Sequence, residues 1–230
     1  MLSKPTFLLR RMLGWFVRED KVSPERSFRF LCRQIAHEFE SVDRNCVIAV
    51  TPASTEGESS SHALMLAATL DDEIGGKVLL VDGAFSKRRS LSAAFDAKQD
   101  AGFAELCKGL EEEATGLFKP PNRKNVHFLP AGKTTTVLKQ GRARQVIDSL
   151  RNSFDYIVVS QEATTTDARN LEILRQVDLL LLLVEEGKTR SFELDEQEDA
   201  MKNIGITDIR IVLVLPEKMA LHRFDLEYAM

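Results

Sequence analysis

The chain lacks long apolar runs, paired cysteines and metal-ligand motifs. None of its 230 residues belongs to a stretch of the roughly 18 uncharged apolar residues that span a bilayer. Its three cysteines, Cys32, Cys46 and Cys107, are too widely spaced for a metal motif or a disulfide framework. Its four histidines show no metal-ligand spacing. These absences exclude a membrane-spanning helix and a Cys/His metal centre, and they favour buried thiols in a reducing, cytoplasmic compartment.

The chain also lacks an excess of positive charge. Its formal net charge is −4 and its pI is about 5.7, so no global electrostatic attraction to nucleic acid is expected. With 43% apolar residues, the 230 residues suffice for one sizeable domain and a short arm but not for two full domains. We therefore expect an arm at residues 1–22 and one domain at residues 23–230.

Beyond the arm, apolar strand-like runs alternate with helical patterns. A helix is predicted over residues 24–39. The predicted strands are at residues 47–51, 78–81, 126–129, 156–159, 179–184 and 209–215. These runs of Val, Ile and Leu show no polar alternation, which is typical of parallel strands covered on both faces. The sequence therefore predicts an α/β fold with a doubly wound, mostly parallel sheet.

The arm has the pattern of a basic amphipathic helix. On a helical wheel Lys4, Arg11 and Arg18 fall on one stripe, while the large apolar residues cover a broad arc that includes Trp15 and Phe16. Such a helix can lie in a membrane interface or dock on a partner's juxtamembrane helix. It can equally pack on its own domain. We expect a peripheral membrane contact through residues 1–18, with that alternative open.

The first predicted strand leads through a loop into a helix, as in a phosphate-binding P-loop. The motif G-x-x-x-x-G-K-[ST] would place its first glycine at Pro52 and its lysine at Glu58. What remains of the motif is Gly57, followed by Ser59 and Ser60. A carboxylate at position 58 repels phosphate by about 4 kcal/mol at an effective dielectric constant of 20.

The start of this helix still offers unpaired backbone N–H groups and a positive dipole end. We hypothesise that Glu58 or Glu56 fills this anion position as an internal substitute for phosphate. The alternative is an ordinary polar cap on the helix. The Gly-Lys-Thr of AGKTTT at residues 131–136 is no substitute P-loop, because the earlier glycine would fall at His127, and Lys133 is expected in an exposed loop.

Several passages occur in the order found in one bacterial family. They are SPERSFRFLCRQI, TPASTEGESSS, GGKVLLVDGAFSKRRSLSAAF, GFAELCKG, VHFLPAGK, LRNSFDYIVVS and VDLLLLLVEEGKTR. In these passages the chain resembles the cytoplasmic tyrosine autokinases of capsular and exopolysaccharide biosynthesis, within the MinD/ParA-like P-loop group. The resemblance covers about residues 23–215. It implies a P-loop NTPase-like fold, ATP-dependent phosphorylation and a partner in the inner membrane.

Three departures from that family's pattern concern the nucleotide site. Glu58 replaces the P-loop lysine, Ala84 replaces the second aspartate after Asp82, and Ser160 replaces the Walker B aspartate. Phosphoryl transfer depends on these charges for positioning and electrostatic stabilisation. We therefore expect a degenerate nucleotide site at Gly57, Glu58, Ser59, Ser60 and Asp82, with no catalytic residue and no metal site. No cofactor is expected, and ATP with magnesium would be one only if this site still binds it.

Two further departures concern assembly and phosphorylation. The family's C-terminal tyrosine cluster is reduced to Tyr228, because the other tyrosine, Tyr156, is predicted in a core strand. The family's ring motif E-x-x-R-x-x-R aligns with Arg26, Arg29 and Cys32, so only its central arginine remains. Whether the chain forms a homo-oligomer is therefore left open.

The sequence as a whole favours a non-catalytic regulatory or adaptor subunit of bacterial exopolysaccharide synthesis and export, in a capsule or holdfast-like pathway. The partner implied by the resemblance is an inner-membrane chain-length determinant, or polysaccharide co-polymerase, which places the protein at the inner face of the inner membrane. Two alternatives stay open. One is a divergent active tyrosine autokinase or ATPase that uses Lys77, Lys87 or Lys133. The other is a MinD/ParA-like positioning factor.

Overall fold

A computed structural model describes residues 24–40, 45–85, 90–98, 100–109, 123–133, 141–163, 168–206 and 208–215. The predicted arm at residues 1–22, Lys87 and Tyr228 lie outside the described residues. The boundary between arm and domain therefore stays a prediction.

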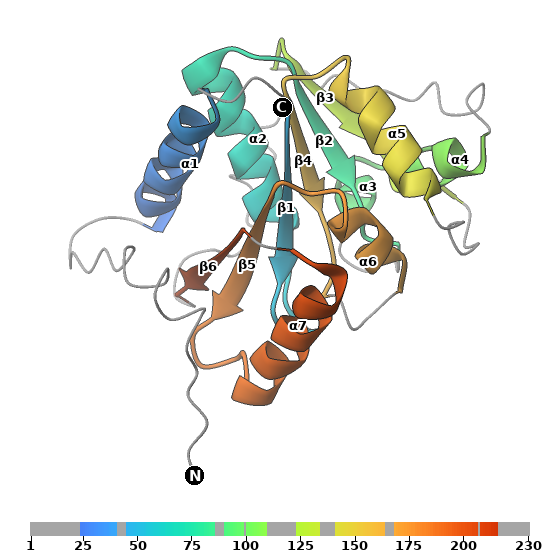
Figure 1. Cartoon of the computed structure of the whole chain (residues 1–230). Helices are drawn as coiled ribbons and strands as arrows, with labels where there is room; N and C mark the ends of the chain where they lie inside the picture. The colour runs from blue at the N-terminus through green and yellow to red at the C-terminus, as the bar shows by residue number, and fades with distance from the viewer. Residues whose placement is uncertain are drawn as a thin grey trace.

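The described residues form one six-stranded sheet in which every neighbouring pair of strands is parallel (Figure 1). The strand order is β3-β2-β4-β1-β5-β6. The strands are β1 (Cys46–Pro52), β2 (Val78–Asp82), β3 (Val126–Leu129), β4 (Tyr156–Ser160), β5 (Leu179–Glu185) and β6 (Ile209–Val214). This sheet confirms the α/β, parallel-sheet prediction, and each predicted strand occurs within about one residue of its expected ends.

Helices cover both faces of the sheet (Figure 1). α1 (Pro24–Glu40) and α2 (Ser60–Ile74) lie on one face, and α5 (Arg142–Arg151), α6 (Ala168–Leu174) and α7 (Ser191–Ile204) lie on the other. Two shorter helices, α3 (Leu91–Ala94) and α4 (Phe103–Lys108), precede β3. The sheet is therefore doubly wound, as predicted, and its carboxyl ends meet at one edge.

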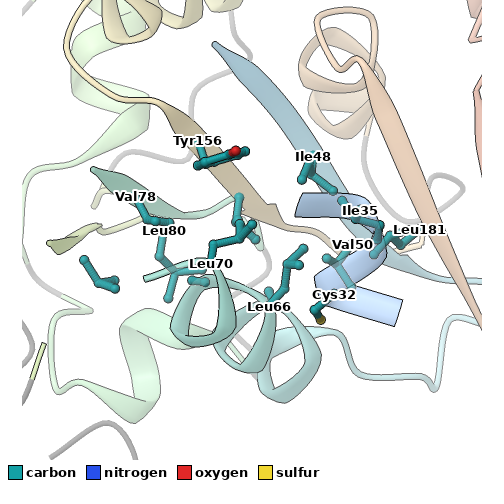
Figure 2. Packing of buried hydrophobic residues seen from close by; sticks show 14 of the residues in the cluster. Cys32, Ile35, Ile48, Val50, Leu66, Leu70, Val78, Leu80, Tyr156 and Leu181 are labelled. Atoms are coloured by element: carbon teal, nitrogen blue, oxygen red, sulfur yellow. The ribbon is translucent and has the colours of Figure 1, made fainter. Parts of the chain in front are cut away.

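The larger core lies between α1, α2 and the sheet. Ile48 and Val50 of β1 point toward Leu66 and Leu70 of α2, and Ile35 of α1 closes the same cluster (Figure 2). All five side chains are fully buried. Every residue of β1 is buried because helices cover both of its faces, which is why its sequence shows no polar alternation.

The sequence of α2 explains its length and its packing. Ala63, Leu66, Ala67 and Leu70 recur at the spacing of one helical face and are all fully buried. The helix ends at Gly75, whose φ of 75° lies in the left-handed region that favours glycine. The opposite end of the helix, at Ser60, faces the carboxyl edge of the sheet.

An ion pair joins three elements at the amino edge of the sheet. Arg151, at the end of α5, lies 2.7 Å from the Asp178 carboxylate. The same carboxylate accepts a 2.9 Å hydrogen bond from the backbone N–H of Val47, and Arg151 donates to the Gln176 carbonyl. These contacts hold the starts of β1 and β5 together at the amino edge, opposite the carboxyl edge where the loop between β1 and α2 lies.

Among the described residues no helix is both long and apolar enough to cross a membrane.

Removing a large side chain from the main core tests this packing. Leu66→Ala should lower the free energy of unfolding by about 2–5 kcal/mol, because the surrounding sheet and helices cannot fully close the cavity. Met65→Ala, at a partly buried position of the same helix, should cost well under half of that. Urea denaturation followed by circular dichroism measures both changes, and equal losses would contradict this description of α2.

Candidate functional site

The loop between β1 and α2 crosses the carboxyl edge of the sheet. Ala53 donates its backbone N–H to the Leu183 carbonyl at 2.8 Å, which ties the loop to β5. The loop then turns, and Gly57 donates to the Ser54 carbonyl at 3.1 Å. A Cβ at Gly57 would lie 2.6 Å from the Pro52 side chain, so close packing requires glycine here. Gly57 thus has a structural role in addition to its match with the P-loop motif.

Glu58 contacts the first turn of α2. One carboxylate oxygen accepts a hydrogen bond from the backbone N–H of Ser61 at 3.1 Å, and the other accepts from the Ser61 hydroxyl at 3.0 Å. An N-terminal helical N–H has no partner within the helix, and a carboxylate beside it is favoured by the helix dipole. Glu58 therefore caps α2 from a position where the P-loop motif has a lysine.

Ser59 joins α2 to the end of β4. Its hydroxyl donates to the Gln161 carbonyl at 2.6 Å and lies 2.9 Å from the Ser160 hydroxyl. Ser59 and Ser160 are both buried. The two positions that carry a magnesium-binding hydroxyl and a Walker B aspartate in the motif are thus bonded directly to each other. Ser60 follows as the first buried residue of α2.

Asp82 lies at the end of β2 and is fully buried. Its carboxylate accepts hydrogen bonds from the backbone N–H groups of Ala84, at 3.0 Å, and Ser92, at 2.6 Å. Burial raises the pKa of Asp82, while hydrogen bonds from Ser92, Ala84 and Ser90 oppose that rise. The carboxylate therefore fastens the end of β2 to the start of α3.

His62 is a site residue that the sequence interpretation missed. Its ring packs edge-on against Phe28 of α1 at 5.2 Å between centroids, and its Nδ1 lies 3.3 Å from the Ser61 hydroxyl. Burial lowers the pKa of His62, and the carboxylates of Glu58 and Glu185 oppose that effect. Its spacing of four residues before Leu66 is the signal that could have placed it on the buried face of α2.

Arg169 of α6 is a second missed residue. Its guanidinium carbon lies 4.4 Å from the centroid of the Phe85 ring, three residues beyond Asp82. Such a distance fits a cation–π contact. Arg169 therefore brings positive charge to the loop that follows β2, although no motif in the sequence marks it.

Lys77 and Lys133 were possible replacements for the missing P-loop lysine. Neither belongs to the loop between β1 and α2. Lys77 precedes β2, so about five residues of strand, or roughly 16 Å, separate it from the carboxyl edge. Its backbone N–H is bonded to Asp155 at the amino edge. Lys133 is exposed and follows β3. For Lys77 the interpretation as a phosphate ligand is thus wrong.

The arrangement supplies capping and cross-linking hydrogen bonds around the start of α2. Glu58 presents negative charge to the first turn, and Ser59 and Ser160 contribute neutral hydroxyls.

Tyr156 is buried in β4, as expected for a packed core aromatic. The described residues contain no group of three or more His, Cys, Asp or Glu side chains placed to hold a metal ion.

Comparisons with known proteins show what the sequence and the fold are similar to. No family model matches the chain. The tyrosine-protein kinase CpsD of Streptococcus pneumoniae serotype 4 is 23% identical over 193 residues, which cover 82% of this chain and 83% of CpsD.

Solved structures share the fold. The kinase domain of the Escherichia coli tyrosine kinase ETK has a TM-score of 0.63 at 17% identity, covering 87% of this chain and 79% of that one. MinD in the MinC:MinD cell division complex of Aquifex aeolicus has a TM-score of 0.60 at 18% identity, covering 73% and 68%. The chain is related to the bacterial tyrosine kinases of capsule and exopolysaccharide synthesis, and Glu58 and Ser160 stand where the family's pattern has the P-loop lysine and the Walker B aspartate.

Proposed function

We propose that the protein is a non-catalytic regulatory or adaptor subunit of bacterial exopolysaccharide synthesis and export, in a capsule or holdfast-like pathway. The observation that carries the proposal is the bond between the Glu58 carboxylate and the backbone N–H of Ser61. In a P-loop this end of the helix receives phosphate. Here the chain's own carboxylate binds there and opposes a second anion.

The remaining residues do not fit a magnesium nucleotide. The Ser59 hydroxyl is held against β4, where it donates to the Gln161 carbonyl and lies 2.9 Å from the Ser160 hydroxyl, and Ser160 offers no carboxylate to a metal ion. Asp82 is fully buried and accepts two backbone N–H groups. Magnesium usually keeps several waters and needs oxygen ligands at near-octahedral positions. A lone, enclosed carboxylate is a poor magnesium ligand, so this set of residues does not support phosphoryl transfer.

The partner in this proposal is the inner-membrane chain-length determinant, or polysaccharide co-polymerase. The family resemblance implies that such a partner docks its cytoplasmic tail beside the nucleotide site. A subunit that has lost turnover can keep that surface, because the fold around it is intact from β1 to β6. The arm at residues 1–18 would add a second, weaker membrane contact, since stable anchoring generally takes two signals.

Nucleotide binding should respond to the charge at position 58. The native protein should give no binding heat with ATP or ADP, with or without magnesium. Glu58→Lys should bind at least about a hundredfold more tightly, because it replaces a repulsion of several kcal/mol by an attraction. Isothermal titration calorimetry measures both proteins.

Glu56→Lys is the matched control for that experiment. It adds the same charge two residues earlier, at an exposed position of the same loop, and should leave binding undetectable. Tight magnesium-dependent binding of ATP by the native chain, or release of phosphate from ATP, would contradict the proposal and favour an active kinase or ATPase.

The capping role of Glu58 predicts a stability change of its own. Glu58→Gln should lower the free energy of unfolding by about 0.5–1 kcal/mol, because the helix end loses its negative partner. The melting temperature should fall by roughly 1–4 °C. Glu56→Gln should change it by much less, and calorimetric melting curves of both variants decide. A more stable Glu58→Gln protein would mean that the carboxylate strains the loop instead of capping it.

The adaptor role predicts association that is independent of nucleotide. The tagged protein should co-purify with the co-polymerase from detergent-solubilised inner membranes equally with and without added ATP. Quantitative mass spectrometry of the purified material measures the ratio. Loss of the co-polymerase on nucleotide removal would contradict a subunit without turnover, and its absence under all conditions would contradict the choice of partner.

A further inference from the structure

The two ends of the sheet differ in how they are protected. β3, at one end, has four residues, is almost wholly buried and is followed by Pro130. β6 lies at the other end (Figure 1). It has six residues, and all of them are at least partly exposed. Within the described part of the chain β6 pairs with β5 alone. Among the described residues, nothing pairs with the row of backbone hydrogen-bonding groups on its outer edge.

Within β6 itself, the usual sequence features that prevent an edge strand from pairing are missing. Its sequence, IRIVLV, contains no lysine and no proline. Its register with β5 runs one residue to one from Ile209 to Val214, so no bulge interrupts it. Its one charge, on Arg210, is 17% exposed and lies 2.8 Å from Glu38 of α1. This charge is therefore held against α1, away from a position where it would repel a neighbouring strand.

The residues on one face of β6 form an apolar row. Ile209 and Ile211 pack with the core under α7, and the alternation of the strand puts Leu213 and then Leu215 on the same face. Leu213 is 47% exposed and Leu215 is 48% exposed. The row thus becomes more exposed toward the carboxyl end, beyond the part that the core covers.

We propose that two copies of this chain associate through antiparallel pairing of β6 with β6. A two-fold axis perpendicular to the sheet places the strand against itself, so the same edge serves both partners. With Val212 on the axis, Leu213 lies beside Ile211 of the second copy, and Leu215 lies beside Ile209. The apolar row is therefore complementary to itself in this register.

A second copy fits this edge better than a strand with charged or alternating polar residues would. The exposed row on β6 is entirely apolar, and a two-fold arrangement covers both exposed leucines of each copy at once. The pairing uses backbone groups of β6 and needs no nucleotide. It also leaves the carboxyl edges of the two sheets pointing in opposite directions, so both altered loops stay accessible.

Sedimentation velocity of the full chain over a range of concentrations tests the proposal. The native protein should show a monomer–dimer equilibrium, and Leu213→Lys should raise the dissociation constant at least tenfold by placing a charge on each edge. Phe192→Lys is the matched control, because Phe192 is 51% exposed but lies on α7. It should leave the dissociation constant unchanged.

Thermal unfolding of both variants checks that they remain folded. Both melting curves should stay close to that of the native protein, because each substitution is at an exposed position. A native protein that stays monomeric at every concentration, or a dimer that Leu213→Lys and Phe192→Lys weaken equally, would overturn the proposal.

Cysteine cross-linking tests the geometry independently, because the three native cysteines are buried. Val212→Cys should form a disulfide-linked dimer on mild oxidation, since residues opposed at the axis lie within about 4.5–5.5 Å between Cα atoms. Ile209→Cys should not, because the two copies of that residue would be about six residues apart along the pair. Equal cross-linking of both variants would rule out this register, and efficient cross-linking of Ile209→Cys alone would rule out a two-fold axis at Val212.

Discussion

The N-terminus of α2 imposes a requirement that the loop before it must meet. Its first backbone N–H groups have no partner within the helix, and the helix dipole concentrates positive charge there. A P-loop meets this requirement with phosphate and a lysine that balances the phosphate charge. Here Glu58 contributes its carboxylate to Ser61, and the loop remains folded around an anion that belongs to the protein.

That substitution is matched by the changes next to it. Ser59 and Ser160 share a hydrogen bond where a hydroxyl and a carboxylate would otherwise surround a metal ion. An aspartate at position 160 without such an ion would place a buried charge beside Asp82, which is fully buried on the neighbouring strand. Unpaired buried charges are costly. Serine at position 160 removes that cost and keeps the link between β4 and α2, so the altered site is consistent as a structural unit.

The sequence predicts the fold well because the fold depends on strong, local patterns. Apolar runs rich in Val, Ile and Leu identify all six described strands, and the spacing of Leu66 and Leu70 identifies the buried face of α2. The order of the strands is less accessible, because it depends on crossovers between distant segments. For this reason the position of β6 at the end of the sheet, and its open edge, emerge only in three dimensions.

The sequence predicts where the candidate site lies, but it does not predict which hydrogen bonds the site residues make. The motif places Gly57, Glu58, Ser59 and Ser60, because a strand, a glycine-containing loop and a helix leave little freedom. The bond between Ser59 and Ser160 joins residues 101 positions apart, so no local pattern reveals it. Sequence comparison alone treats positions 58 and 160 as two separate losses of charge.

The geometry instead connects these losses through Ser59, which lies between Glu58 and Ser160 and is bonded to β4. Restoring a lysine at position 58 would change the charge at the helix end but would leave position 160 without a carboxylate and Asp82 fully buried and bonded to two backbone N–H groups. Phosphate affinity and metal binding are therefore separable in this chain, and regaining the first does not by itself restore the second.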